Sequence, residues 1–281
     1  MKMKVNGMEV LFDSHAHFRG TDASGYAVQE QLDRAAQNGV QQIVAVGGSC
    51  DLNAAAFKAA EVAPHVIRAA IGFDRDQDAE MVSEEAIRDA TERLARVAGS
   101  SGDLGVTVCA IGEIGLDYHY SPETRDGQMA LFDAQCALAR ELNLPVIVHS
   151  RDADQDTLDV LQRYAGKDSG QLRGVLHCFT RDLPFAAALV EMGFYVSFSG
   201  ILTFRNADAL RDVARQLPAE HLLVETDSPY LAPVPHRGKR NEPAFVGEVV
   251  KMLATVRATS FEQMARVTTE NARKLFRFPQ A

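Results

Sequence analysis

The chain has 281 residues, of which 46% are hydrophobic, and this length and composition suffice for one large domain with a sizeable core. Its formal net charge of −9 argues against a protein that coats nucleic acid by general electrostatics, so any such contact requires a local basic cluster. Because the four cysteines lie far apart and no targeting segment is evident, we expect no disulfide framework, no thiolate zinc site, no signal peptide, no membrane span and a cytoplasmic location.

Short runs of β-branched residues alternate with longer stretches of helical periodicity along the chain. The first predicted strand, residues 10–17, precedes a predicted helix at residues 26–38. The other predicted strands lie at residues 42–46, 66–71, 106–113, 146–149, 175–177, 195–198 and 222–226. The other predicted helices lie at residues 52–62, 80–97, 125–143, 154–164, 183–192, 206–216, 245–255 and 261–276. The glycine- and serine-rich residues 99–102 are predicted to form a loop.

Helices separate nearly all of the predicted strands, which indicates a parallel α/β architecture. Residues able to carry chemistry recur at the ends of strands scattered through the whole chain. In a closed barrel these ends converge on one mouth, whereas an open doubly wound sheet would spread them along a crevice. We therefore predict a (β/α)8 TIM barrel that forms a single domain over residues 1–281, with a metal site at the C-terminal mouth of the strands.

His15 and His17 lie two residues apart in the first predicted strand, so both side chains project from one face. Two adjacent imidazoles are a suitable pair of nitrogen ligands for a divalent metal, although such a pair alone is a weak signal. Other residues with ligand chemistry end later strands and strengthen it, namely Glu113, His149, His177 and Asp227.

Each of the later ligand candidates also has an alternative role as a structural residue. A buried carboxylate such as Glu113 needs compensation, either from a salt bridge or from ions that it bridges. A lone histidine that ends a buried strand is usually a satisfied core residue, but His149 and His177 end successive strands, which favours ligation. Asp227 shares a strand face with Glu225, and we expect Glu225, one step deeper, to contact a ligand or to be a partner within the barrel core rather than to bind an ion.

With these residues in place, the chain resembles the TatD family of metal-dependent deoxyribonucleases, within the amidohydrolase-like barrels. The matching segments are residues 13–17 (DSHAH), 112–118 (GEIGLDY), 149–151 (HSR), 177–179 (HCF), 199–204 (SGILTF), 225–233 (ETDSPYLAP) and 237–243 (RGKRNEP). They span nearly the whole chain, and the run from 225 to 243 is the most specific.

The resemblance implies a site with two divalent cations per subunit. The residues that it assigns are His15, His17 and Asp227 to one ion, His149 and His177 to the other, and Glu113 as the bridge between them. Histidine-rich ligation suits zinc or manganese better than magnesium, although family members are commonly described as magnesium-using, so the metal stays open. Glu113 and Asp227 are the catalytic candidates, and Asp227 would orient a water molecule and take its proton.

The resemblance also implies hydrolysis of phosphodiester bonds in DNA, with single strands trimmed from the 3′ end. A monomer with no stable protein partner is the default expectation. The one dense basic run in this acidic chain lies just beyond the last strand. The candidates for substrate binding are Arg151, Thr203, Arg237, Lys239, Arg240 and Asn241. The candidates for stacking on an unpaired base are Tyr118, Phe179, Phe204 and Tyr230.

Two other functions stay open. The acidic charge favours a hydrolase of a small ester, amide, lactone or phosphoester, and a non-catalytic binding module is opposed by the six retained ligands. The chain departs from the family at residues 72–75, where many relatives carry a histidine-proline pair, and at residues 179–181, where relatives usually read phenylalanine, serine, glycine. Both departures lie on the expected rim, so they bear on substrate choice more than on metal binding.

Overall fold

The computed structural model describes residues 4–5, 8–18, 27–74, 83–165 and 171–279, and its centre is one eight-stranded parallel sheet. The strands of this sheet are β3 (Leu11–Ala16), β4 (Val40–Gly48), β5 (Ile67–Phe73), β6 (Val108–Asp117), β7 (Val146–Arg151), β8 (Gly174–Leu176), β9 (Tyr195–Phe198) and β10 (Leu222–Val224). They pair in chain order from β3 to β10. A separate antiparallel pair is formed by β1 (Lys4–Val5) and β2 (Met8–Glu9).

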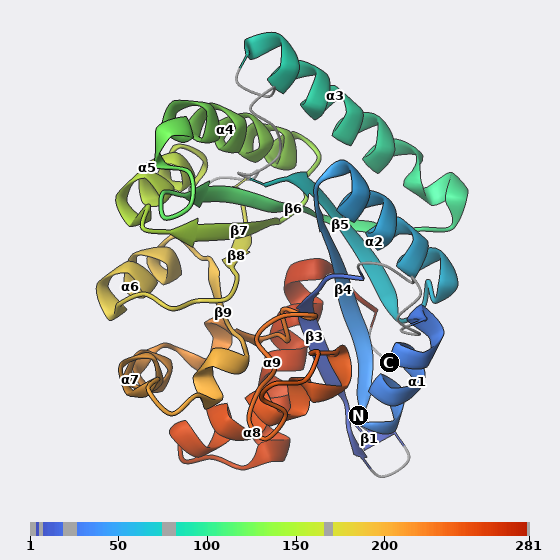
Figure 1. The fold of residues 1–281 in the computed structure, drawn as a ribbon, viewed down its shortest axis with the longest axis vertical. Helices are drawn as coiled ribbons and strands as arrows, with labels where there is room; N and C mark the ends of the chain where they lie inside the picture. The colour runs from blue at the N-terminus through green and yellow to red at the C-terminus, as the bar shows by residue number, and fades with distance from the viewer. Residues whose placement is uncertain (1–3, 6–7, 19–26, 75–82, 166–170, 280–281) are drawn as a thin grey trace.

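Helices ring the outside of this sheet (Figure 1). They are α1 (Val28–Gln37), α2 (Cys50–Val62), α3 (Glu84–Ser100), α4 (Arg125–Glu141), α5 (Asp154–Tyr164), α6 (Leu183–Glu191), α7 (Asp208–Gln216), α8 (Val246–Val256) and α9 (Phe261–Phe276). The predicted (β/α)8 barrel is therefore confirmed. Among the described residues, no helix is long and apolar enough to cross a membrane.

The loop predicted at residues 99–102 is wrong, because α3 continues to Ser100 and a 3-10 helix follows at Ser101–Leu104. The Ser100 hydroxyl donates to the carbonyl of Arg96 at 2.9 Å, and the Ser101 hydroxyl donates to that of Ala98 at 2.9 Å. These serines therefore support helical turns. The start of the helix predicted at residues 80–97 and the first residue of that predicted at 26–38 lie outside the described residues.

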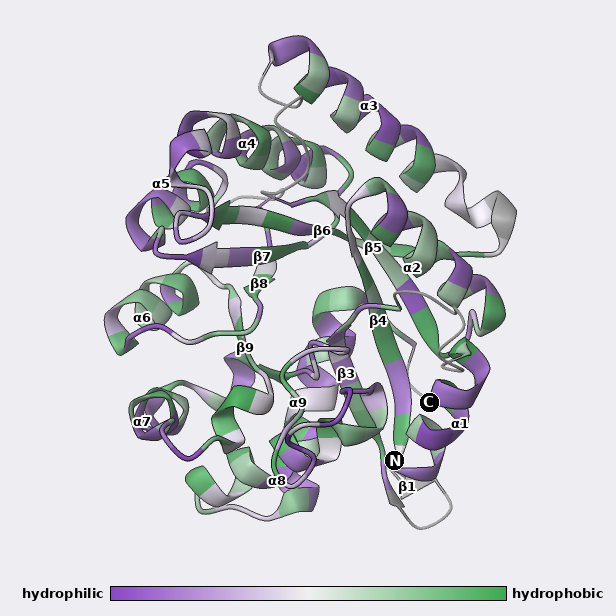
Figure 2. Ribbon diagram, viewed as in Figure 1, coloured by the Kyte–Doolittle hydropathy of each residue, from purple (hydrophilic) through white to green (hydrophobic). Residues whose placement is uncertain are grey.

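The barrel has two hydrophobic layers. One lies between the sheet and the helices, and the other fills the barrel interior, where Phe12, Ile147 and Leu223 meet Phe276 and Phe278 from the end of α9. Figure 2 shows the corresponding pattern, with largely hydrophobic central strands and helices such as α3 that alternate between hydrophobic and hydrophilic sides. Burial on both faces explains the continuous apolar runs of the strands.

The seam between the first and last strands closes through few backbone contacts. Ala16 and Ser228 form an isolated parallel bridge just beyond β10. Below it, the Asp13 carboxylate accepts hydrogen bonds from the backbone N–H of Thr226 at 2.9 Å and from the Thr226 hydroxyl at 2.6 Å. A side chain thus replaces part of the strand ladder. This closure brings His15 of β3, and His17 just after it, beside Asp227.

Candidate metal centre

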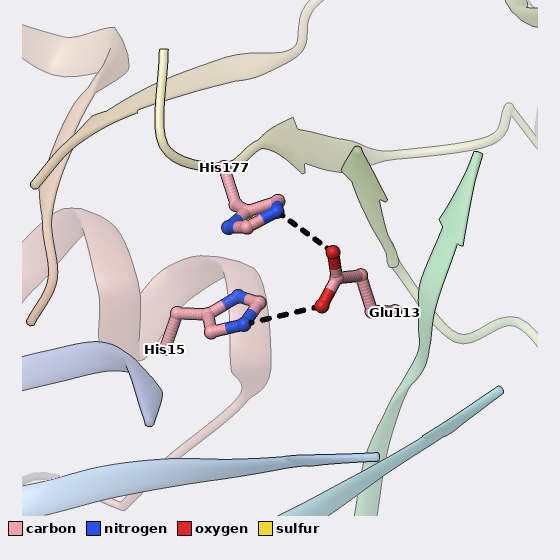
Figure 3. A group of neighbouring side chains, drawn as sticks. All are labelled: His15, Glu113 and His177. Atoms are coloured by element: carbon pink, nitrogen blue, oxygen red, sulfur yellow. Dashed lines mark hydrogen bonds and ion pairs between the residues drawn. The ribbon is translucent and has the colours of Figure 1, made fainter. Parts of the chain in front are cut away.

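The carboxylate of Glu113 lies at the centre of the cluster at the mouth of the barrel. Its Oε2 atom is 3.6 Å from Nε2 of His15 and 3.5 Å from Nε2 of His17. Its Oε1 atom is 3.0 Å from Nε2 of His177 and 3.3 Å from Nδ1 of His149. Figure 3 shows His15 and His177 pointing at opposite oxygens of Glu113. One carboxylate therefore faces two pairs of imidazole nitrogens.

Asp227 completes the cluster from the last strand. Its Oδ1 atom is 3.8 Å from Nε2 of both His15 and His17. The backbone of Asp227 is left-handed, with a φ of 55°, a conformation that aspartate tolerates better than most residues. Two groups have ligand atoms that lie within 4.8 Å of one another, one of His15, Glu113 and His177 and one of His15, His17 and Asp227. The structure thus brings all six predicted ligands together.

Contacts on the outer side of two rings determine which nitrogen faces the cluster. Nδ1 of His17 is 2.9 Å from the carbonyl of Val46. Because a carbonyl only accepts, Nδ1 carries a proton, and Nε2 is the nitrogen that faces Glu113 and would bind a cation there. In the same way Nδ1 of His177 donates to Oε1 of Glu225 at 3.3 Å. Of the two roles expected for Glu225, the structure shows the contact with a candidate ligand.

His149 is oriented by a carboxylate to which the sequence analysis gives no role. Its Nε2 atom is 3.1 Å from Oδ2 of Asp117, which leaves Nδ1 facing Glu113. Asp117 ends β6, four residues after Glu113, so the two carboxylates share a strand face. That spacing was the available signal for an additional residue at the site.

Burial and mutual contact shift the titration of the cluster. Burial raises the pKa of Asp227 to about 7 and lowers that of His15 to about 4. Burial also works against ionisation of Glu113, but the surrounding histidines hold its pKa well below the usual range. Burial works against protonation of His17 and His177, but Glu113 raises the pKa of both rings, so in the metal-free cluster protons occupy positions where imidazole and carboxylate ligands would hold a divalent cation. The residues present therefore suit a metal centre.

The cluster forms one wall of a cavity of about 640 Å³. Both departures from the family pattern reach this cavity, because Asp74 and Thr180 line it. Of the predicted substrate-binding residues, Arg151 lines it as well. Tyr230, another lining residue, is 49% exposed, and its ring meets that of His17 edge-on with 6.3 Å between the ring centres.

Two predicted substrate-binding residues have internal partners instead. The Thr203 hydroxyl donates to the carbonyl of Gly200 at 2.7 Å and accepts from the N–H of Val234 at 2.9 Å. The Asn241 side-chain amide donates to the carbonyl of Tyr230 at 2.6 Å. Neither Thr203 nor Asn241 lines the cavity. Both side chains stabilise the loop that follows β10.

The basic residues of that loop also lie outside the cavity wall. The guanidinium of Arg237 lies 3.9 Å from the centre of the Phe204 ring and donates to the carbonyl of Ala232 at 3.0 Å. Lys239 and Arg240 do not line the cavity. The structure thus separates the basic run from the candidate metal centre.

Two of the predicted stacking residues are engaged elsewhere. Phe179 is 1% exposed and belongs to the core. The Tyr118 hydroxyl donates to Asp156 at 2.6 Å. Together with the arginine that covers Phe204, these contacts leave Tyr230 as the predicted stacking residue that faces the cavity.

Comparison with known proteins identifies the family to which this chain belongs. The family model described as TatD related DNase matches residues 12–277. An uncharacterized metal-dependent hydrolase of Bacillus subtilis is 38% identical over 268 residues, which cover 95% of this chain and 99% of that protein. The 3′-5′ ssDNA/RNA exonuclease TatD of Pantoea ananatis is 40% identical over 174 residues, 60% of this chain and 66% of that protein. The crystal structure of a TatD homologue from Escherichia coli superposes with a TM-score of 0.84 at 29% identity, covering 96% of this chain and 98% of that one. The chain belongs to the TatD-related DNase family of metal-dependent hydrolases.

Proposed function

We propose that this hydrolase cleaves phosphodiester bonds of DNA and removes nucleotides from the 3′ end of single strands. The observation that carries the proposal is the position of Glu113 between two pairs of imidazole nitrogens. This arrangement suits a carboxylate that joins two cations about a phosphate. The name of the Pantoea relative, an exonuclease on single strands, supports the choice of substrate.

The proposed ligands are those implied by the resemblance. His15, His17 and Asp227 would hold one cation, His149 and His177 the other, and Glu113 would bridge them. Bound there, two cations lower the pKa of water and polarise phosphoryl oxygens. The histidine-rich donor set favours zinc or manganese over magnesium.

The side chains of the site have the other roles in hydrolysis. Asp227, the carboxylate that the resemblance assigns to the attacking water, would orient that water and take its proton. Glu225 and Asp117 hold the rings of His177 and His149 in place. Arg151 lines the same cavity and would neutralise charge on the bound phosphate.

Basic residues near the site extend the proposal to the rest of the DNA strand. We propose that Arg237, Lys239 and Arg240 contact phosphates of the strand outside the cavity. We also propose that residues 1–281 act as one domain and as a monomer with no stable protein partner. The four cysteines are free thiols, which supports a location in the reducing cytoplasm.

The charge of the cavity favours a second candidate, hydrolysis of a small ester, amide, lactone or phosphoester. Among the residues that the structure describes, the carboxylates of Asp74, Glu113 and Asp227 line the cavity together with one arginine, Arg151. That balance suits a small substrate with little negative charge. The predicted basic run does not change it, because its residues lie outside the wall.

Salt dependence separates the two candidates. The metal-loaded protein is incubated with a 5′-labelled single-stranded oligonucleotide and with a panel of small esters at increasing salt. We expect products shortened from the 3′ end, formed more slowly as salt screens the phosphates. Turnover of an ester that is indifferent to salt, with the oligonucleotide left intact, would establish the second candidate instead.

A further inference from the structure

An arginine and an exposed tyrosine pair on the rim of the metal cavity. Arg151 ends β7 two residues after His149 and lines the cavity. Its guanidinium carbon lies 4.7 Å from the centre of the Tyr120 ring. Tyr120 follows β6 and is 62% exposed, so most of this large aromatic side chain faces solvent. The sequence analysis did not single out Tyr120.

The pair is built on the same carboxylate that orients a candidate metal ligand. Oδ1 of Asp117 accepts the backbone N–H groups of His119 at 2.9 Å and of Tyr120 at 3.0 Å. Oδ2 of the same side chain contacts His149 at 3.1 Å. The N–H of Tyr118 donates to the carbonyl of Arg151 at 2.9 Å, which ties the two strand ends together. The rim is therefore held in a defined position relative to the metal centre.

The charge of Arg151 is not neutralised by its acidic neighbours. Those neighbours pair with other cations, Asp152 and Asp154 with Arg181 at 3.1 and 2.8 Å and Asp156 with Arg125 at 2.8 Å. Among the residues that the structure describes, none forms an ion pair with Arg151. An arginine that forms no ion pair within the described part of the chain, and that lies beside a candidate phosphate site, is suited to an anion.

We propose that Tyr120 and Arg151 form a nucleotide subsite at the entrance of the cavity. An unpaired base stacks on the exposed ring of Tyr120, and Arg151 contacts the phosphate of that nucleotide. The inference builds on the proposed function and adds a requirement to it. A base inside a duplex is already stacked on its neighbours, so the strand must be unpaired beyond the nucleotide that is removed.

The test compares Tyr120→Leu with Tyr120→Phe on single-stranded oligonucleotides that carry one abasic residue at successive positions from the 3′ end. On the fully based strand, loss of one stacking contact predicts a fall in kcat/KM of about tenfold for Tyr120→Leu, with recovery in Tyr120→Phe. At one abasic position, wild type and Tyr120→Leu should become equal, because the base that Tyr120 contacts is missing.

The chain offers a matched control. Tyr164, at the C-terminal end of α5, also lies under an arginine, with the guanidinium of Arg140 5.6 Å from its ring centre. Helices of this barrel run back to the face opposite the mouth, so Tyr164 is remote from the cavity. Tyr164→Leu should hydrolyse every oligonucleotide at the wild-type rate.

A binding measurement separates this inference from the proposed function. Kd values of the same oligonucleotides are measured by fluorescence anisotropy on metal-stripped protein. The subsite is supported and the nuclease rejected if DNA stays intact while Tyr120→Leu binds it more weakly than wild type, and if this difference in Kd disappears at one abasic position. Shortened DNA with equal kcat/KM and Kd for Tyr120→Leu and wild type would reject the subsite alone. A loss of equal size at every abasic position would also reject it, and absence of DNA binding would reject both.

Discussion

Glu225 contacts His177 through the ring nitrogen that faces away from the metal centre. Oε1 of Glu225 is 3.3 Å from Nδ1 of His177 and also accepts the backbone N–H of Cys178 at 2.7 Å. The opposite nitrogen of the ring is 3.0 Å from Glu113. A carboxylate in this position orients the ring and makes its free nitrogen a stronger ligand.

Substitution of this outer carboxylate should weaken metal binding while the barrel stays folded. In Glu225→Gln the amide oxygen can still accept from Cys178, but the charge behind His177 is gone. We expect metal affinity to fall by about 10- to 100-fold, measured by competition with a chromogenic chelator. Glu248→Gln, which removes a carboxylate on α8 that faces Lys251 at 3.8 Å, serves as the control. Equal affinities for wild type and Glu225→Gln would contradict the role of Glu225.

Removal of the central carboxylate should lower the amount of bound metal. Glu113→Ala deletes the oxygens that face all four imidazoles, so we expect fewer metal ions per chain after dialysis, measured by elemental analysis. Asp74→Asn is the matched control, because Asp74 lines the same cavity without belonging to either group of candidate ligands. Wild-type metal content in Glu113→Ala would show that the carboxylate does not bridge.

The metal-free protein should lose stability as the pH rises through neutrality. Burial raises the pKa of Asp227 to about 7 and that of Asp13 to about 8. A carboxyl whose pKa is higher in the folded state stabilises the fold while protonated, and this contribution disappears as the pH passes the folded-state pKa. In the presence of a chelator we therefore expect the Tm to fall as the pH rises from about 4, the ordinary carboxyl pKa, to about 8, the folded-state pKa of Asp13.

Two comparisons check the origin of this decline. Asp227→Asn has no carboxyl to ionise, so its Tm should decline less over the same range. Saturating metal should reverse the slope, because a cation displaces the proton and binds more tightly as the pH rises. Parallel Tm curves for wild type and Asp227→Asn without metal would exclude Asp227 as the group responsible.

The strands and helices were largely predictable, because buried parallel strands appear as continuous apolar runs and helices as a period near 3.6 residues. The ends of these strands and helices were less predictable. β6 runs to Asp117, beyond the predicted end at residue 113, because its pairing with β7 continues as far as Arg151. Asp117 pairs with Arg151, which lies 34 positions later in the chain. The residues around Asp117 give no information about this pairing, so the end of β6 could not be predicted from them.

The six ligand candidates were predictable because each lies at or after the end of a predicted strand, and the C-terminal ends of parallel strands converge. The contacts that surround them were not. Val46 orients His17 through a backbone carbonyl, and any residue type would offer that atom. The basic run was predicted near the mouth from its place after the last strand, but only the fold shows that Arg237 packs on Phe204 instead of lining the cavity.

The side-chain seam of the barrel should contribute measurably to stability. Asp13→Ala leaves the buried N–H and hydroxyl of Thr226 without the carboxylate that now accepts from both. We expect the free energy of unfolding to fall by about 2 kcal/mol or more, measured by urea denaturation. Asp33→Ala on the exposed side of α1, where Asp33 accepts from Gln29, should leave the unfolding midpoint almost unchanged. Similar midpoints for the two variants would show that the seam is held by other contacts.

Chelation and restoration of activity is the most direct test of a metal-dependent nuclease. Metal-stripped protein is mixed with a 5′-labelled single-stranded oligonucleotide, and zinc, manganese or magnesium is added back, with Glu113→Ala in parallel. We predict shortening from the 3′ end that appears only after metal is restored and is lost in Glu113→Ala. An oligonucleotide that stays intact with every metal, or that is shortened equally by Glu113→Ala, would contradict a metal-dependent nuclease centred on Glu113.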